Sequence, residues 1–264
     1  MFAIDEIGHD RVFVSIYENN SKDKTPMLLQ QLNNTLTSKG VAHRIVHEVL
    51  PHSFYEQGRI VRLASLRNKA LEPLYAEARE GLNGRQFEKV VFLNDIYFTA
   101  DTLFKLLRTR NGVYDQACAI DYFWLGLYDT WIVRDQLASK VRPLWPYFPM
   151  PADKRTVRSR GIVPVNSCWN GMTAFDARWF FASTNSTAVQ GVADENAPAI
   201  ARMNMPTPTH DDHFDTPATL PLYFRTSNDC YESECLLSSL DMHRIATPIR
   251  PQIYINSDLA VGAY

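Results

Sequence analysis

The order of apolar and polar residues predicts alternating strands and helices through the first half of the chain. Short runs rich in Val, Ile and Phe are typical of strands, and longer segments with apolar residues three and four positions apart are typical of helices. We therefore expect, in order, a strand at Arg11–Glu18, a helix at Thr25–Gly40, a strand at His43–Leu50, a helix at Arg59–Glu80, a strand at Lys89–Leu93, a helix at Asp101–Gly112 and a strand at Gln116–Asp121. This alternation predicts an α/β fold in which helices cover both faces of a mostly parallel central sheet.

The pattern becomes irregular after Asp121. Aromatic residues crowd together, and residues 192–221 hold five prolines, as in a long loop. A helical pattern returns at residues 230–244, and a last strand is expected at residues 248–256. Since no repeat or interior linker is present, we expect one domain over residues 1–264, with a regular half at about 11–125 and an irregular half at about 126–264.

Composition indicates an ordinary globular protein. The chain has 264 residues, 45% of them hydrophobic, and 27 basic against 29 acidic residues give a net charge of -2. Without a positive field, nucleic acid is not expected as a partner. No window approaches the roughly 20 apolar residues that span a bilayer, and the N-terminus lacks the basic-then-apolar order of a signal peptide. The chain as given is therefore expected to be soluble, with membrane attachment only through a segment outside it.

Two features bear on the compartment. Acceptor triplets for N-glycosylation suit a lumenal protein, and they occur at Asn19, Asn33 and Asn185. The even number of cysteines permits up to two disulfides in three pairings, or buried thiols instead, at Cys118, Cys168, Cys230 and Cys235.

The strongest chemical signal is the apolar strand at Lys89–Leu93, which is followed by Asn94 and Asp95. In open α/β sheets, ligands bind at the carboxyl ends of strands, so Asp95 is placed for a ligand. A carboxylate that holds Mn²⁺ or Mg²⁺ lets the ion neutralise the charge on a nucleoside-diphosphate leaving group. The alternative is that Asp95 only caps the next segment.

Groups for the phosphates must come from side chains, because the glycine-rich motifs GxGxxG and GxxxxGK[ST] are both absent. Arginines on the expected helix at Arg59–Glu80 suit a pyrophosphate, and Asn68 stands among them. The candidates on this helix are Arg62, Arg67 and Asn68. Tyr17 and Glu18, at the end of the first strand, are candidates for reading the nucleotide base.

A sugar site is indicated near the middle of the second half. Trp169 offers a flat apolar face, Asn170 offers two donors and an acceptor, and Gly171 permits close backbone approach. The alternative is a buried tryptophan in a core turn.

The last candidates are acidic or could bind a metal. Glu232 and Glu234 are flanked by Cys and Leu, which predicts burial and a perturbed pKa, and Glu234 is the candidate catalytic group of the two. Asp241 and His243 are possible further metal ligands. Weaker signals are expected to be structural, namely a solvated loop at residues 210–213 and an ion-paired corner at Asp129, Arg134 and Asp135.

Six segments occur in the order found in one family. They are SLRNKALEPL, FEKVVFLNDIYF, YDQACAID, YDTWIVRD, SCWNGMTAFDA and SECLL. In these motifs, from about residue 12 to residue 248, the chain resembles the fungal cryptococcal mannosyltransferase family, the capsule-associated α-1,3-mannosyltransferases.

The resemblance implies a GT-A fold, GDP-mannose as donor, a divalent metal, retention of anomeric configuration, and a type II membrane protein of the Golgi or secretory pathway. It puts Asp95 in the place of the metal-binding DxD signature and Trp169, Asn170 and Gly171 beside the donor or acceptor sugar. It makes Glu234 the catalytic carboxylate. Because the acidic signature holds a single Asp, Asp241 or His243 would assist at the metal.

These expectations combine into a retaining mannosyltransferase. The first half would bind the nucleotide sugar, and the second half would bind a mannan-type glycan acceptor. One alternative is a transferase that uses UDP-galactose or UDP-xylose. Another is a glycan-binding scaffold without turnover.

Overall fold

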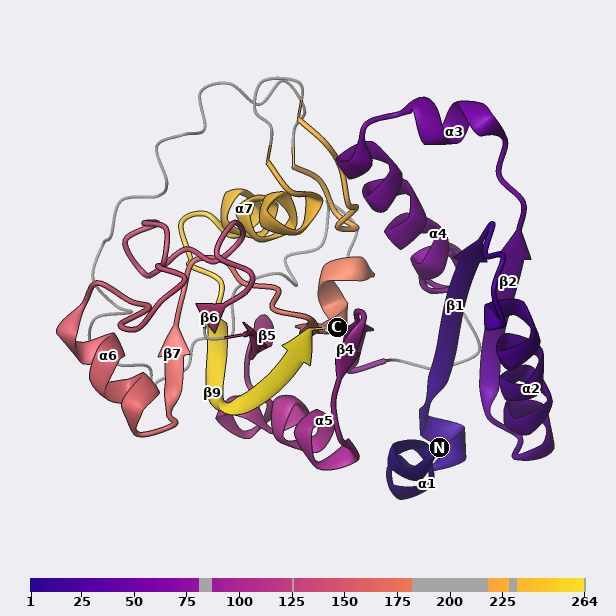
Figure 1. Cartoon of the computed structure of the whole chain (residues 1–264), viewed down its shortest axis with the longest axis horizontal. Coiled ribbons are helices and arrows are strands. Elements are labelled where there is room, and N and C mark those ends of the chain that lie inside the picture. Colours follow the sequence, from indigo (N-terminus) through magenta and orange to yellow (C-terminus); the bar gives the residue numbers. More distant parts are fainter. Residues whose placement is uncertain (81–86, 125, 182–217, 228–231, 264) are drawn as a thin grey trace. The chain divides into compact units, whose positions relative to one another are not determined.

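The computed structural model describes residues 1–80, 87–124, 126–181, 218–227 and 232–263. The chain divides into two compact units, Met1–Asn83 and Gly84–Tyr264, which are described in turn (Figure 1). A single domain with its halves meeting near residue 125 stays a prediction. No helix within the described ranges is both long and apolar enough to cross a bilayer.

The first unit holds the expected βαβ opening. Strands β1 (Phe13–Asn19) and β2 (Ala42–Glu48) pair in parallel, and helix α2 (Thr25–Ser38) connects them. Helix α2 packs along β2, whereas α4 (Arg59–Glu80) packs along β1 (Figure 1). The unit also contains α1 (Phe2–Ile7), η1 (His9–Arg11) and α3 (His52–Glu56).

The second unit is built on a seven-stranded sheet with the order β3-β8-β5-β9-β4, in which β6 pairs with β5 and β7 pairs with β9. Its strands are β3 (Lys89–Leu93), β4 (Ile96–Tyr97), β5 (Gln116–Phe123), β6 (Gly126–Leu127), β7 (Ile162–Pro164), β8 (Met172–Asp176) and β9 (Ile253–Ala263). Its helices are α5 (Ala100–Leu107), η2 (Thr109–Gly112), α6 (Pro151–Arg158), η3 (Ala177–Phe180) and α7 (Glu234–Ala246).

This sheet is mixed, which corrects the expectation of a mostly parallel sheet. Only β5 and β9 pair in parallel among its described strands, and every other pair is antiparallel. The difference arises mainly from β8, which lies between β3 and β5 and runs against both. Four of its five residues are buried, so its sequence lacks the alternation that marks a half-exposed strand.

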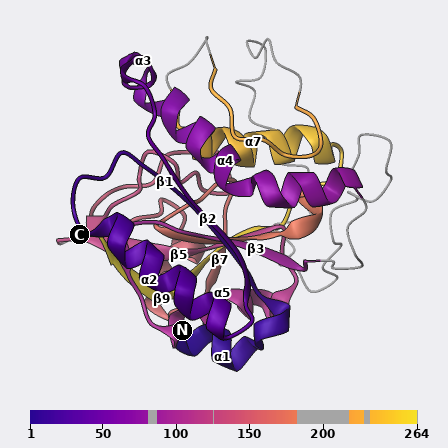
Figure 2. The same cartoon turned by 90° about the vertical axis from the view of Figure 1, so that its right-hand side faces the viewer.

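Helices cover both faces of the sheet, as the sequence predicts. Alternate residues of β5 point to opposite faces, so Ala117 and Ala119 join one core cluster while Cys118 and Ile120 join another. The first cluster includes Leu106 of α5. Figures 1 and 2 show α7 on the side of the sheet opposite α5. The second unit is therefore an α/β structure whose central strands are buried on both faces.

Candidate functional site

Polar side chains gather where β3 and β5 end and β8 begins. Because both strands run against β8, β3 and β5 share a direction, and their carboxyl ends lie at one edge of the sheet. A pocket of about 240 Å³ opens at this edge. It is lined by Asn94, Asp95, Asp121, Phe123, Tyr128, Asp129 and Gly171.

Asp95 lies where the strand pattern predicts. Strand β3 ends at Leu93, and the backbone N–H of Asn94 then donates to the carbonyl oxygen of Gly171 at 2.9 Å. Asp95 is exposed and lines the pocket, so it is accessible to a ligand. Its role as a metal ligand stays a prediction.

Two further carboxylates line the same pocket. Asp121 is buried near the end of β5, and its carbonyl oxygen accepts from the Tyr128 backbone N–H at 3.0 Å. Asp129 accepts a hydrogen bond from the Asn170 backbone N–H at 3.1 Å. The sequence predicts only a strand end at Asp121 and a structural corner at Asp129. For Asp121, the available signal was the one that marks Asp95, an apolar run that ends in an acid.

Gly171 forms part of one wall of the pocket, whereas its neighbour in the turn, Asn170, is buried and does not line it. Both residues have positive φ, 52° and 72°, a backbone conformation that favours Gly and Asn. The Asn170 side-chain amide donates to the Ala119 carbonyl oxygen at 2.9 Å, which ties the turn to β5. A Cβ atom on Gly171 would lie 3.1 Å from Oδ2 of Asp121. Glycine is thus required here because the side chains of Ile96 and Asp121 lie close to the backbone, and its approach to a sugar stays a prediction.

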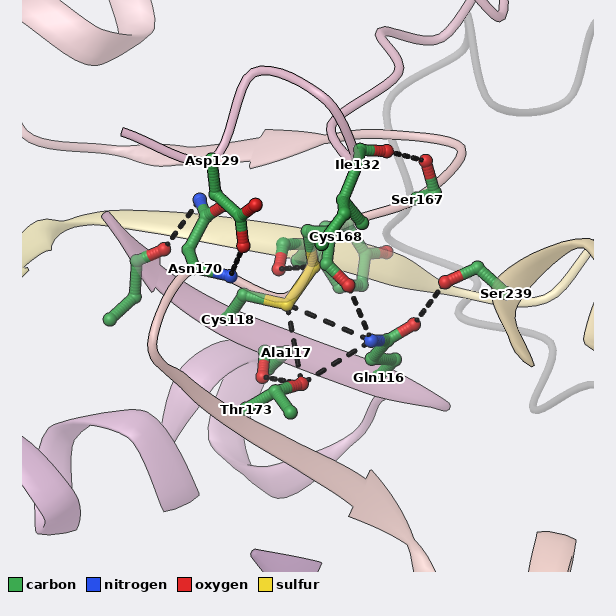
Figure 3. The surroundings of a disulfide bond; sticks show 12 residues. Gln116, Ala117, Cys118, Asp129, Ile132, Ser167, Cys168, Asn170, Thr173 and Ser239 are labelled. Carbon is green, nitrogen blue, oxygen red and sulfur yellow. Dashed lines mark hydrogen bonds between the residues drawn. A yellow bond between two sulfur atoms is a disulfide. The ribbon is translucent and has the colours of Figure 1, made fainter. Parts of the chain in front are cut away.

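A disulfide fixes this wall to β5 (Figure 3). Cys118 and Cys168, both buried, are linked with a sequence separation of 50. Gln116 braces the link, because its side-chain amide donates to the Cys168 carbonyl oxygen at 2.8 Å. Cys118 precedes Asp121 by three residues, and Cys168 precedes Asn170 by two. The disulfide therefore positions two of the segments that line the pocket.

Trp169 is placed differently from a sugar-stacking residue. It is 1% exposed and packs against Phe92 and Phe224, with ring centroids 5.1 and 5.6 Å away. Gly171, two positions further on, lines the pocket, but the indole ring of Trp169 packs in the core. The alternative of a buried tryptophan describes this position.

Glu234 lies at the start of α7 and is 1% exposed. Its carboxylate accepts from the Ser233 hydroxyl at 3.1 Å, and it is not among the residues that line the pocket. Glu232 contacts Arg134 at 3.6 Å. The catalytic assignment of Glu234 stays a prediction.

Asp241 and His243 have protein partners. Asp241 accepts two hydrogen bonds from Arg225 at 2.6 and 2.7 Å. His243 donates from Nε2 to the Asn166 carbonyl oxygen at 2.9 Å, and burial lowers the pKa of its imidazole to about 4. Within the described part of the chain, no group of three or more His, Cys, Asp or Glu side chains is arranged to hold a metal ion by itself.

The residues expected to read the base lie in the first unit. The Tyr17 hydroxyl donates to Glu48, and Lys69 donates to the same hydroxyl at 3.0 Å. Glu18 contacts His47 and accepts from the Ser21 backbone N–H at 2.8 Å. Burial raises the pKa of the Tyr17 hydroxyl.

The candidate phosphate residues also lie in the first unit, on α4. Arg62 donates to the Tyr55 carbonyl oxygen at 3.3 Å, and Asn68 accepts from the Tyr75 hydroxyl at 3.4 Å. Arg67 follows on the same helix. Convergence of these residues with Asp95 on one ligand stays a prediction. Three other features lie outside the described residues: the 210–213 cluster, Asn185 and Cys230.

Comparison with known proteins connects the chain to one group of enzymes. The family model described as cryptococcal mannosyltransferase 1 matches residues 1–241. The chain is also 28% identical over 199 residues to the alpha-1,3-mannosyltransferase CMT1 of Cryptococcus neoformans var. neoformans serotype D. The match covers 68% of this chain and 42% of that relative, so the chain spans less than half of the relative's length. No solved structure matches the chain.

Proposed function

Because this chain belongs to the cryptococcal mannosyltransferase 1 family, we propose that it transfers mannose from GDP-mannose to a hydroxyl group of a mannose-containing glycan. The product would be an α-1,3 linkage formed with retention of configuration. The observation that carries the proposal is the pocket at the ends of β3 and β5, where three carboxylates meet the backbone of Gly171. A polar pocket at the carboxyl ends of sheet strands is a typical place for a ligand in an α/β protein.

The pocket fits a divalent cation in its chemistry. Carboxylate oxygens are the hard ligands that Mg²⁺ and Mn²⁺ take, and one or two carboxylates suffice when substrate phosphates complete the shell. We assign this role to Asp95, which is exposed, and Asp121, which lies deeper in the same pocket. A bound ion would supply charge neutralisation at the departing diphosphate.

We assign to Asp129, the third carboxylate of the pocket, the role of facing the reacting sugar. Its Oδ2 is held by the Asn170 N–H, so the side chain is oriented before any ligand arrives. In the reaction, the bond from the anomeric carbon to the phosphate oxygen breaks and a bond to the acceptor oxygen forms. The anomeric carbon becomes positively charged in the transition state, and a fixed carboxylate nearby stabilises that charge.

Two routes retain configuration. In a double displacement, a carboxylate attacks the anomeric carbon and displaces GDP, which gives a glycosyl-enzyme. The acceptor oxygen then attacks the same carbon and displaces the carboxylate. In the front-face route, the departing phosphate takes the acceptor proton on the same face and the carboxylate only stabilises charge. Asp129 and Glu234 are the two candidates for the carboxylate.

A GT-A-like organisation is part of the proposal. It is supported by acids at the carboxyl ends of β3 and β5, at one edge of an α/β sheet, even though that sheet is mixed. We further propose a location in the lumen of the secretory pathway, with a membrane anchor outside this chain. The disulfide supports this location, because such bonds persist in oxidising compartments.

The test is a donor screen with defined acceptors. The protein is incubated with Mn²⁺, methyl α-mannoside or short α-mannosides, and in turn GDP-mannose, UDP-galactose and UDP-xylose. We expect product from GDP-mannose, with an α-1,3 linkage by NMR. Product from a UDP-sugar alone would assign a different donor. Saccharide binding with no transfer from any donor would favour a glycan-binding scaffold.

A further inference from the structure

An aromatic turn stands at the rim of the carboxylate pocket. Strands β5 and β6 form a hairpin in which Phe123 pairs with Gly126, and the tight turn between them begins at Trp124. Trp124 is 88% exposed. The exposed indole is thus presented to solvent at the tip of a hairpin.

Neither packing nor backbone conformation explains a tryptophan at this position. A residue that is 88% exposed adds little to the core. Trp124 also has φ of 56°, in the left-handed region where a bulky side chain is strained by roughly 1–3 kcal/mol. Tight hairpin turns favour Gly, Asn or Asp there. Exposed aromatic residues held in unfavourable backbone conformations are therefore candidates for ligand contact.

The neighbours of Trp124 connect it to the pocket. Phe123 and Tyr128 are 44% and 59% exposed, and both line the pocket with the three carboxylates. The ring centroid of Phe123 lies 6.2 Å from that of Trp124 and 5.8 Å from that of Tyr128. We call Phe123, Trp124 and Tyr128 the aromatic rim. It runs from the solvent-exposed turn to the wall of the pocket.

We propose that the aromatic rim binds the acceptor saccharide, with Trp124 stacking on a pyranose ring whose hydroxyl enters the carboxylate pocket. This inference rests on the proposed glycosyl transfer for its ligand class. A pyranose has apolar C–H faces that suit an aromatic plane and equatorial hydroxyls that donate to carboxylates. The rim and pocket together offer both kinds of surface.

The openness of the turn favours a glycan chain over a nucleotide base. Small ligands such as bases are usually enclosed, with 70–90% of their surface buried. An indole at a hairpin tip leaves space for neighbouring sugar units on either side, as a polymeric acceptor requires. The charge is also suitable, because a neutral saccharide meets no repulsion from Asp95, Asp121 and Asp129.

The test uses the full chain and variants of the turn. Trp124→Gly removes the ring and relieves the positive-φ backbone, so it is expected to fold at least as stably as the wild type. Trp124→Phe keeps an aromatic face. Trp145→Ala is the matched control, because Trp145 is also exposed, at 44%, but its ring contacts Tyr147, which does not line the pocket, whereas the ring of Trp124 contacts Phe123, which does.

Two readouts are measured for each variant. The first is binding of a short α-mannoside, followed by saturation-transfer NMR without donor. The second is the KM for acceptor and for GDP-mannose in the transfer assay. Loss of one aromatic stacking contact is expected to weaken saccharide binding and raise the acceptor KM roughly tenfold for Trp124→Gly. Trp124→Phe should lie between, and Trp145→Ala should match the wild type.

Unchanged saccharide binding in Trp124→Gly would overturn the inference. A rise confined to the KM for GDP-mannose would also overturn it, because it would assign the aromatic rim to the donor. Absence of saccharide binding by the wild type would also overturn it. If the wild type transfers no sugar but binds α-mannosides in a Trp124-dependent way, the proposed function fails and the aromatic rim stands.

Discussion

Removing the disulfide between Cys118 and Cys168 is expected to destabilise the protein and disturb the pocket together. The bond closes a loop with a sequence separation of 50. For such a loop, the chain-entropy relation gives a stabilisation of about 4 kcal/mol. Total stabilities of domains are about 5–15 kcal/mol, so this contribution is a large part of the whole.

The perturbation is the double variant Cys118→Ala/Cys168→Ala, which also removes buried sulfur atoms. Its free energy of unfolding is measured by urea titration, followed by tryptophan fluorescence and circular dichroism. We expect a loss of about 4 kcal/mol, and wild-type protein reduced with dithiothreitol should lose a similar amount. Cys235→Ala is the control, because Cys235 is equally buried but lies outside the disulfide. Its loss should be about 1 kcal/mol.

The double variant should also lose activity beyond its loss of folded protein, since the disulfide joins the segments that carry Asp121 and Asn170. Peptide mapping under non-reducing conditions checks the pairing directly. Free thiols at Cys118 and Cys168 in the mature protein would contradict this prediction. A linked pair whose double variant is as stable as Cys235→Ala would contradict it equally.

Three further predictions concern backbone space and buried titratable groups. Gly171→Ala would place a Cβ 2.6 Å from Cγ2 of Ile96 at φ of 72°, so it should lose about 2–4 kcal/mol of stability. The control Gly40→Ala, at φ of 67°, would place a Cβ with no atom of the described residues within 4 Å and should lose about 1 kcal/mol. Equal losses in urea unfolding would contradict this. Burial lowers the pKa of His243 to about 4, so the unfolded state takes up a proton before the folded state does as pH falls from 6.5 to 4. The free energy of unfolding of the wild type should therefore drop by up to about 3 kcal/mol over that window. His243→Gln should not show this drop. Equal pH profiles for the two proteins would show that His243 does not cause the drop. Burial raises the pKa of Asp153 to about 6, so the unfolded state releases its proton before the folded state does as pH rises. The wild type should therefore lose stability relative to Asp153→Asn between pH 4 and 6. Above pH 6 the difference should reach up to about 3 kcal/mol. An unchanged difference at pH 4 and pH 7 would contradict the raised pKa.

Local patterns in the sequence predict several elements well. The strand at Lys89–Leu93 has the bounds expected from its apolar run, and Asn94 and Asp95 after it line a pocket. The helix at Arg59–Glu80 also matches. These features depend on neighbouring residues, whose periodicity is visible in the chain. The family that the six ordered motifs predict is confirmed by the family model, which matches residues 1–241.

Features that depend on distant residues are not visible in this way. Trp169 has the composition of a sugar platform, but Phe92 and Phe224 bury its ring from other parts of the chain. Strand β8 is hidden because burial on both faces removes its alternation. Asp121 and Asp129 become neighbours of Asp95 only through the antiparallel placement of β8. The pairing of sheet strands, rather than any local motif, therefore assembles the pocket.

We propose that transfer takes place in the pocket lined by Asp95, Asp121 and Asp129. The most direct measurement is the kcat for transfer from GDP-mannose to an α-mannoside by Asp129→Asn, with Asp101→Asn as control because the Asp101 side chain is 71% exposed and lies outside the pocket. We predict a loss of roughly 100-fold or more for Asp129→Asn and near-wild-type turnover for Asp101→Asn. Turnover by Asp129→Asn equal to that of the control, in a folded protein, would contradict the account.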